Sequence, residues 1–172
     1  MTIEEAIKTA VDHEERVRDL YKESINKVNN STVQKIFKVL ADEEETHVDY
    51  LKNSLKEWED SGIISVEKLE TAIPNKDVIE ANIKKLKKYT YEQEFNEELE
   101  AFKKALESEI ESTNFYKRMV KELPEESQGL FTRLIEIEEG HELIIQAEID
   151  NLNKLGFWFD FMEFNLEAGY II

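Results

Sequence analysis

The amino-acid sequence predicts an all-α protein, a four-helix bundle built from two helical hairpins. Apolar residues make up 41% and charged residues 35% of the 172 residues, with only 5 Gly and 2 Pro. This mixture favours long helices that have one apolar and one solvated face. Alternating β-branched runs between glycine turns, which would indicate strands, are scarce. The length suits one compact domain with a substantial core, so we expect residues 1–172 to form a single domain.

The first hairpin is predicted over residues 2–61. Its first helix begins with a capping-box pattern at Thr2, in which the hydroxyl and a Glu three residues later satisfy free N–H groups. The dipeptide at 29–30, Asn-Asn, breaks this helix. The second helix begins with a similar pattern at Ser31 and ends before Gly62.

The second hairpin is predicted over residues 96–155. Pro124 suits the first position of its second helix, and the two acids that follow suit the positive end of the helix dipole. The connection at 62–95 is unusually long for a compact domain. We expect it to cross the length of the bundle and to contain a short helix after Pro74.

The segment 156–172, FWFDFMEFNLEAGYII, is rich in aromatic residues and too short and acidic to span a bilayer. We call it the aromatic tail. Such a segment needs covering, so we expect it to pack across the bundle or against a second copy of the chain. The protein is accordingly expected to be a homodimer.

The two hairpins repeat one another with an offset of about 95 residues. HEERVRDLY at 13–21 matches SEIESTNFY at 108–116, and ADEEETH at 41–47 matches EIEEGH at 136–141. The repeat places the same polar residues at the same point of each hairpin.

The predicted core carries a set of acidic and imidazole side chains. Each helix has an apolar line with 4-3-4-3 spacing that is interrupted near its middle by Glu, and two helices add His three residues later on the same face. Each Glu lies about 14 to 16 residues from the turn of its own hairpin, so at about 1.5 Å per residue the heights agree within a few ångströms. The groups expected in one layer are Glu14, Glu44, His47, Glu109, Glu138 and His141.

The charge of this layer favours two metal ions. Four ionised carboxylates and two neutral imidazoles sum to −4, and burying them unpaired would be very costly. Two divalent cations bring the sum to zero. Carboxylate-rich ligation with one imidazole per metal suits iron or manganese better than copper, and lacks the sulfur of structural zinc sites. We therefore expect two Fe ions, with Mn or Zn as substitutes.

Composition excludes several classes of function. The net charge of −17 argues against nucleic acid and anionic membrane surfaces as partners. The chain has no cysteine, which removes disulfides, thiolate metal sites and cysteine nucleophiles. No run approaches 18 apolar residues and the start carries no apolar signal segment, so a cytoplasmic location is expected.

These motifs resemble the rubrerythrin branch of the ferritin-like superfamily over about 120 residues. The matching motifs are Glu14 with Tyr21, Glu44-x-x-His47, Glu109 with Tyr116, and Glu138-x-x-His141. The resemblance implies a ferritin-like bundle with a di-iron site that reacts with hydrogen peroxide or dioxygen. It also implies that Glu44 and Glu138 bridge the metals, that Glu14 and Glu109 are terminal ligands, and that each His binds one metal.

The sequence departs from the rubrerythrin pattern in two ways. Rubrerythrins carry a rubredoxin-type iron site with four cysteines, so electrons here are expected from an external electron-transfer protein. Rubrerythrins also carry an extra Glu at the position of Ser112. Its absence makes the site more symmetric and disfavours peroxide reduction by ligand switching.

Some interpretations stay open from the sequence. The candidate catalytic residues Tyr21 and Tyr116 are either hydrogen-bond donors or redox-active groups beside the site, or ordinary core tyrosines. Gly140 indicates either close packing or a local helix bulge. Glu43 lies off the core line and is expected to be solvated. Besides oxidoreductase chemistry, iron oxidation for storage or detoxification and a non-catalytic metal-binding role both remain compatible with the sequence.

Overall fold

The computed structural model describes residues 1–64, 69–74, 76–83 and 95–153. These residues form five helices and no strand, and the all-α prediction is confirmed for them. The helices are α1 (Ile3–Lys27), α2 (Ser31–Ser61), α3 (Lys76–Ile83), α4 (Asn96–Glu122) and α5 (Glu125–Leu152). The aromatic tail lies outside the described residues.

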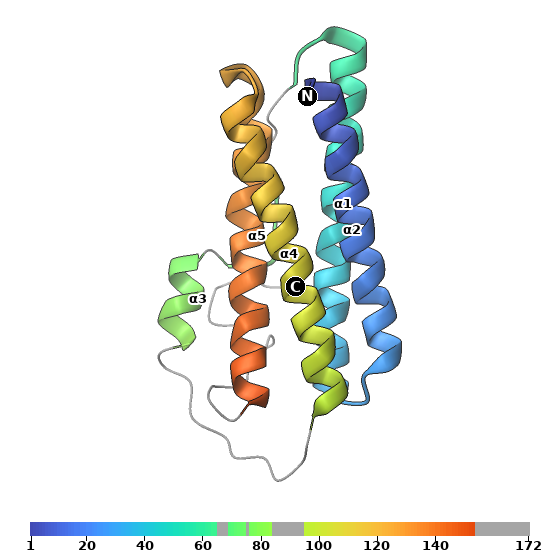
Figure 1. Ribbon diagram of the computed structural model, residues 1–172, viewed down its shortest axis with the longest axis vertical. Helices are drawn as coiled ribbons and strands as arrows, with labels where there is room; N and C mark the ends of the chain where they lie inside the picture. The colour runs from blue at the N-terminus through green and yellow to red at the C-terminus, as the bar shows by residue number, and fades with distance from the viewer. Residues whose placement is uncertain (65–68, 75, 84–94, 154–172) are drawn as a thin grey trace.

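The four long helices form the ferritin-like bundle that the sequence predicts. α1 and α2 form one antiparallel hairpin, α4 and α5 form the other, and α1 packs against α4 (Figure 1). In that view α1 and α5 run downward, whereas α2 and α4 run upward. α2 therefore ends at the opposite end of the bundle from the start of α4, and the connection between them must cover its length.

The helix starts agree with the sequence except in two details. One is Pro124, which is predicted as the first helical residue but caps α5, whose first residue is Glu125. The capping box at Thr2 is present, with Glu5 as its second member. The predicted box at Ser31 is wrong, because Asn30 is the cap and its side chain accepts two N–H groups of the first turn. Gln34, the expected partner in that box, instead donates to the backbone carbonyls that end α1.

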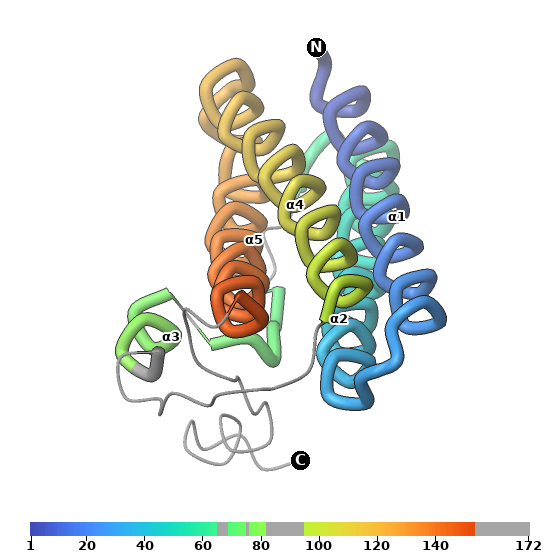
Figure 2. The backbone as a smooth tube through the Cα atoms, turned by 60° about the horizontal axis from the view of Figure 1, so that its bottom comes forward, coloured from blue at the N-terminus to red at the C-terminus, as the bar shows by residue number. Residues whose placement is uncertain are grey.

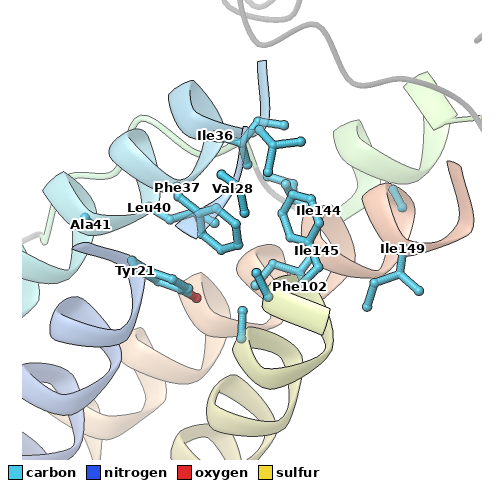
Figure 3. Packing of buried hydrophobic residues seen from close by; sticks show 14 of the residues in the cluster. Tyr21, Val28, Ile36, Phe37, Leu40, Ala41, Phe102, Ile144, Ile145 and Ile149 are labelled. Atoms are coloured by element: carbon cyan, nitrogen blue, oxygen red, sulfur yellow. The ribbon is translucent and has the colours of Figure 1, made fainter. Parts of the chain in front are cut away.

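The bundle core consists of two apolar clusters, one toward each end. The lower cluster in Figure 1 contains the end of α1, and Figure 3 shows it in detail. It is built around Tyr21, Phe37, Leu40, Phe102 and Ile145. The upper cluster contains the start of α1 and is built around Ile7, Leu51, Tyr116, Phe131 and Leu134. Glu14 lies between Val11 of the upper cluster and Val17 of the lower one.

The described segments 69–74 and 76–83 of the connection pack on α5, and α3 lies beside that helix (Figure 2). Leu69 belongs to the upper cluster and Ile73 to the lower one, so the segment 69–74 passes the middle of the bundle. Arg133 of α5 fixes it by donating twice to the carbonyl of Leu69, at 2.8 and 3.2 Å. We call the segment 69–74 the strap. The short helix expected after Pro74 is confirmed as α3.

Gly140 is explained by close packing against the strap. α5 is a regular α-helix from end to end, so the alternative of a bulge is wrong. A Cβ atom at position 140 would lie 3.3 Å from Ile73 Cγ2 and 3.6 Å from the carbonyl oxygen of Pro74. Separately, none of the helices in the described residues is long and apolar enough to cross a membrane.

Candidate metal centre

The structure brings all six residues of the expected layer together between the two apolar clusters. α1 and α4 each supply one Glu, and α2 and α5 each supply Glu-x-x-His. Every one of the six side chains is at most 1% exposed. They form two groups that each offer four possible ligand atoms within 4.8 Å of one another. The six side chains lie at one level along the bundle, as the register predicted from the turn distances requires.

The first group surrounds His47. Its Nδ1 atom lies 3.1 Å from Glu14 Oε2, 3.1 Å from Glu44 Oε2 and 3.1 Å from Glu138 Oε1. A single N–H can donate well to only one of these oxygens. Three oxygens and a nitrogen within 4.8 Å of one another are instead a donor set suited to a divalent cation.

The second group surrounds His141 in the same manner. Its Nδ1 atom lies 3.0 Å from Glu44 Oε1, 3.0 Å from Glu138 Oε2 and 3.3 Å from Glu109 Oε1. Glu44 and Glu138 therefore offer one oxygen to each group. Glu14 faces only His47, whereas Glu109 faces only His141. This division matches the bridging and terminal roles that the rubrerythrin resemblance implies.

Unpartnered atoms in the layer fit two cations. Both oxygens of Glu138 and Oε1 of Glu44 are buried and have no hydrogen-bond partner among the described residues. A buried carboxylate oxygen without a donor is costly. All three oxygens face a histidine Nδ1 atom. A cation bound between each Nδ1 atom and its facing oxygens would therefore satisfy them. The residues present thus fit a two-metal site.

The proton affinities of the layer reflect its excess of negative charge. Burial alone lowers the pKa of His47 and His141, but the surrounding carboxylates raise both well above the usual 6.5. Burial and the charge of Glu138 raise the pKa of Glu44 well above its usual value and that of Glu109 to about 7. Burial also acts on Glu138, but the two histidines bring its pKa below the usual value. Metal binding must therefore displace protons from this layer.

The two tyrosines bind the terminal carboxylates reciprocally across the hairpins. Tyr21 of α1 donates its hydroxyl to Glu109 Oε1 on α4, and Tyr116 of α4 donates to Glu14 Oε1 on α1. Burial and the facing carboxylate raise the pKa of each phenol well above 10. Both hydroxyls therefore stay protonated donors at neutral pH. Of the roles left open by the sequence, hydrogen-bond donation is the one that the contacts support.

Glu43 corrects an expectation from the sequence. The sequence predicts a solvated side chain, but Glu43 is only partly exposed and accepts hydrogen bonds from the Thr71 hydroxyl and the Ala72 backbone N–H. One of its oxygens also lies within 4.8 Å of a ring nitrogen of His47 and of His141. Periodicity could not reveal this residue, because its partners come from the strap rather than from a helix.

Ser112 lies in the core, as its register position predicts. It is 1% exposed, and its hydroxyl has no hydrogen-bond partner among the described residues. The position that carries an extra Glu in rubrerythrins thus faces the interior of this bundle. Here it adds no charge to the layer.

Comparison with known families agrees with the four-helix bundle and its buried Glu and His cluster. The sequence model of the rubrerythrin family matches residues 5–149. The chain belongs to the rubrerythrin family. No match was found among curated proteins or among solved structures. Membership in the rubrerythrin family implies a di-iron protein, and the buried Glu and His cluster of this chain fits that implication.

Proposed function

We propose that this rubrerythrin-family chain is a di-iron carboxylate oxidoreductase that reduces hydrogen peroxide or dioxygen with electrons from a separate protein. One observation carries the proposal. Glu44 and Glu138 each present one oxygen to His47 Nδ1 and the other to His141 Nδ1, at 3.0 to 3.1 Å. Two metal positions joined by two carboxylates are suited to a two-electron reaction.

Two bound iron ions would supply electrons and Lewis acidity at this layer. The side chains of the chain hold and orient the site. Tyr21 and Tyr116 donate to the two terminal carboxylates and restrict their rotation. The apolar clusters above and below the layer keep bulk water away from it. The site thereby presents preorganised charge in a dry environment.

The electron balance requires a donor. Reduction of one hydrogen peroxide to two waters consumes two electrons and two protons. The 172 residues contain no cysteine and so cannot hold a thiolate electron-transfer site. We propose that an external electron-transfer protein restores the two electrons after each turnover.

A single-turnover experiment tests the reaction without knowledge of the donor. The protein is loaded anaerobically with two equivalents of Fe²⁺ and mixed with one equivalent of hydrogen peroxide or with dioxygen in a stopped-flow spectrometer. We expect an iron-based absorption band to appear while one oxidant is consumed per chain. A site that stays ferrous while both oxidants persist would mean that the protein only binds metal.

The native mass separates this function from iron storage. Storage requires a hollow shell of many subunits, with iron as cargo rather than as a resident cofactor. We propose a homodimer, which has no such interior. Native mass spectrometry or light scattering that shows a large closed assembly would favour iron oxidation for storage or detoxification.

A further inference from the structure

The outer nitrogens of the two histidines lack acceptors. The rings of His47 and His141 are stacked, with centroids 5.5 Å apart and planes 11° apart. Their Nδ1 atoms face the carboxylates of the metal layer, whereas both Nε2 atoms are buried and have no hydrogen-bond partner among the described residues. A neutral imidazole that binds a metal through Nδ1 carries its proton on Nε2. In the metal-loaded site the two nearly parallel rings therefore each present an Nε2–H donor that needs an acceptor.

Glu43 is the carboxylate placed to serve them. It is on α2 next to Glu44, but it does not belong to either group of metal-facing carboxylates. One of its oxygens lies within 4.8 Å of a ring nitrogen of each histidine, and these two nitrogens lie within 4.8 Å of each other. A separation of this size is closed by a small side-chain movement or by one bridging water.

The strap holds this carboxylate in place. Glu43 Oε2 accepts from the Thr71 hydroxyl and Oε1 accepts from the Ala72 N–H, the latter at 2.9 Å. A carboxylate has about four acceptor positions, so two remain after these bonds. Two remaining acceptors match the two histidine N–H groups.

We propose that Glu43 is a positioning residue that accepts the Nε2 protons of both metal-binding histidines, directly or through one water. It thereby fixes the tautomer that directs both Nδ1 atoms to the metals. This arrangement departs from the symmetry of the repeat, because the counterpart of Glu43 in the second hairpin is the apolar Ile137. One carboxylate, anchored by the strap, serves both halves. The proposal rests on the two-metal site of the proposed function but not on its reaction.

Nuclear magnetic resonance of the zinc-loaded protein tests it. Zn²⁺ is diamagnetic, so the Nε2 protons of ¹⁵N-histidine-labelled protein can be observed directly. We expect two downfield Nε2–H signals that exchange slowly with water. In Glu43→Gln both should move upfield and exchange faster, because the acceptor loses its charge and one oxygen. The Zn²⁺ affinity should fall about 10- to 100-fold, the usual effect of removing an outer partner of a ligand.

Two control variants separate positioning from general structure. Glu45→Gln removes the next carboxylate along α2, which pairs with Arg18 and Lys22 at the surface, and should leave both signals and the affinity unchanged. Thr71→Ala removes one strap contact but keeps the carboxylate, so both signals should remain. Circular dichroism checks that every variant is folded. Should Glu43→Gln not fold, Glu43→Asp takes its place, and the shorter acid should shift both signals together.

The outcomes are distinct. Unchanged Nε2–H signals in a zinc-loaded, folded Glu43 variant would overturn the proposal. A change in only one signal would overturn the sharing between histidines, and an equal effect of Thr71→Ala would reduce Glu43 to an anchor for the strap. Failure of the unmodified protein to bind two Zn²⁺ would overturn this proposal together with the proposed function.

Discussion

The two hairpins are near copies where they face the metal layer and differ on the outside of the histidines. Toward the layer, each supplies one Glu that faces a single histidine, one Glu that faces both histidines and one His, and each tyrosine binds the single-facing Glu of the other hairpin. On the outside, Glu43 and Thr46 of the first hairpin are matched by Ile137 and Gly140 of the second. The strap passes this side and contacts the two hairpins differently, since it donates hydrogen bonds to Glu43 of α2 and packs against Gly140 of α5. The repeated Glu and His residues make the inner face symmetric, whereas the asymmetric chain path shapes the outer one.

The largest expected effect separates bridging from terminal carboxylates. Glu44 faces both histidines, so Glu44→Ala should abolish binding of two metals. Glu14 faces only His47, so Glu14→Ala should leave about one equivalent bound at His141. Metal analysis after dialysis against Fe²⁺ or Zn²⁺ measures the stoichiometry. If each variant lost the same amount of metal, the division into bridging and terminal roles would be wrong.

The control for that experiment is Glu45→Ala, whose carboxylate pairs with Arg18 and Lys22 at the surface. It should retain two metals. Glu43 is unsuitable as a control, although its position off the core line suggested one, because it lies beside both histidines. Glu44 and Glu45 are adjacent on α2 but face the core and the surface, so different metal loss in their variants tests the helix register directly.

The next largest effect concerns how Tm changes with pH. We expect metal binding to reverse the direction of that change. Without metal, the folded state holds protons on both histidines, whose pKa values are raised well above 6.5, and on Glu109, whose pKa is raised to about 7. A group whose pKa is raised in the folded state stabilises the fold fully at pH values below its unfolded pKa. That stabilisation is lost as the pH rises through the folded pKa. The metal-free Tm should therefore fall by at least about 4 °C from pH 6 to pH 8.

With two metals bound, the trend should be opposite. The ions replace the protons, so affinity and hence Tm should rise over the same interval. The lowered pKa of Glu138 affects only acidic conditions below its usual value and leaves this window untouched. Calorimetric scans of both forms at several pH values measure the trend. A metal-free Tm that rises from pH 6 to pH 8 would show that the layer is not protonated in this way.

The sequence predicted the inner face well and the outer face poorly, for physical reasons. Glu14 and Glu138 interrupt apolar lines at matched distances from helical turns, and rigid helices of constant rise convert those distances into a layer. Glu43 depends on Thr71, a residue of an irregular segment whose path no periodicity encodes. The reciprocal tyrosine contacts lie between these cases, since pairing across hairpins depends on the stagger of helices from different halves. The cap of α2 is Asn30 rather than the predicted Ser31. Adjacent side chains of similar chemistry compete for this position, and periodicity does not decide between them.

The tyrosine contacts test whether the inner symmetry extends to energetics. Tyr21→Phe and Tyr116→Phe each remove one buried hydrogen bond to a carboxylate, which should cost about 1.5–3 kcal/mol of unfolding free energy. Because the contacts are reciprocal, the two losses should agree within about 0.5 kcal/mol. Urea unfolding of the metal-free variants at one pH measures them. A large difference would show that the hairpins are equivalent in geometry but not in energy.

The smallest effect probes the outer asymmetry at a repeat-related pair of positions, Gly140 and Thr46. A side chain at 140 meets Ile73 and Pro74 of the strap, and the two methyl groups of Val would extend beyond a Cβ already at 3.3 Å. Gly140→Val should therefore destabilise the fold by about 1–3 kcal/mol through overpacking.

Thr46 is exposed on α2, where its hydroxyl binds only the carbonyl of Asp42 one turn earlier. Thr46→Val should consequently change the unfolding free energy by less than about 0.5 kcal/mol. Urea denaturation of both variants measures the difference, with equal m-values as the check that each unfolds in the same way. Both positions hold the same place in the repeat and so the same height in the bundle. Replacing Gly by Val raises the intrinsic helix propensity, whereas Thr and Val are similar in it, so a loss of stability at position 140 must come from packing against the strap. Equal stabilities would mean that the strap yields to the added methyl groups, and that the contact at Gly140 is not what excludes larger side chains there.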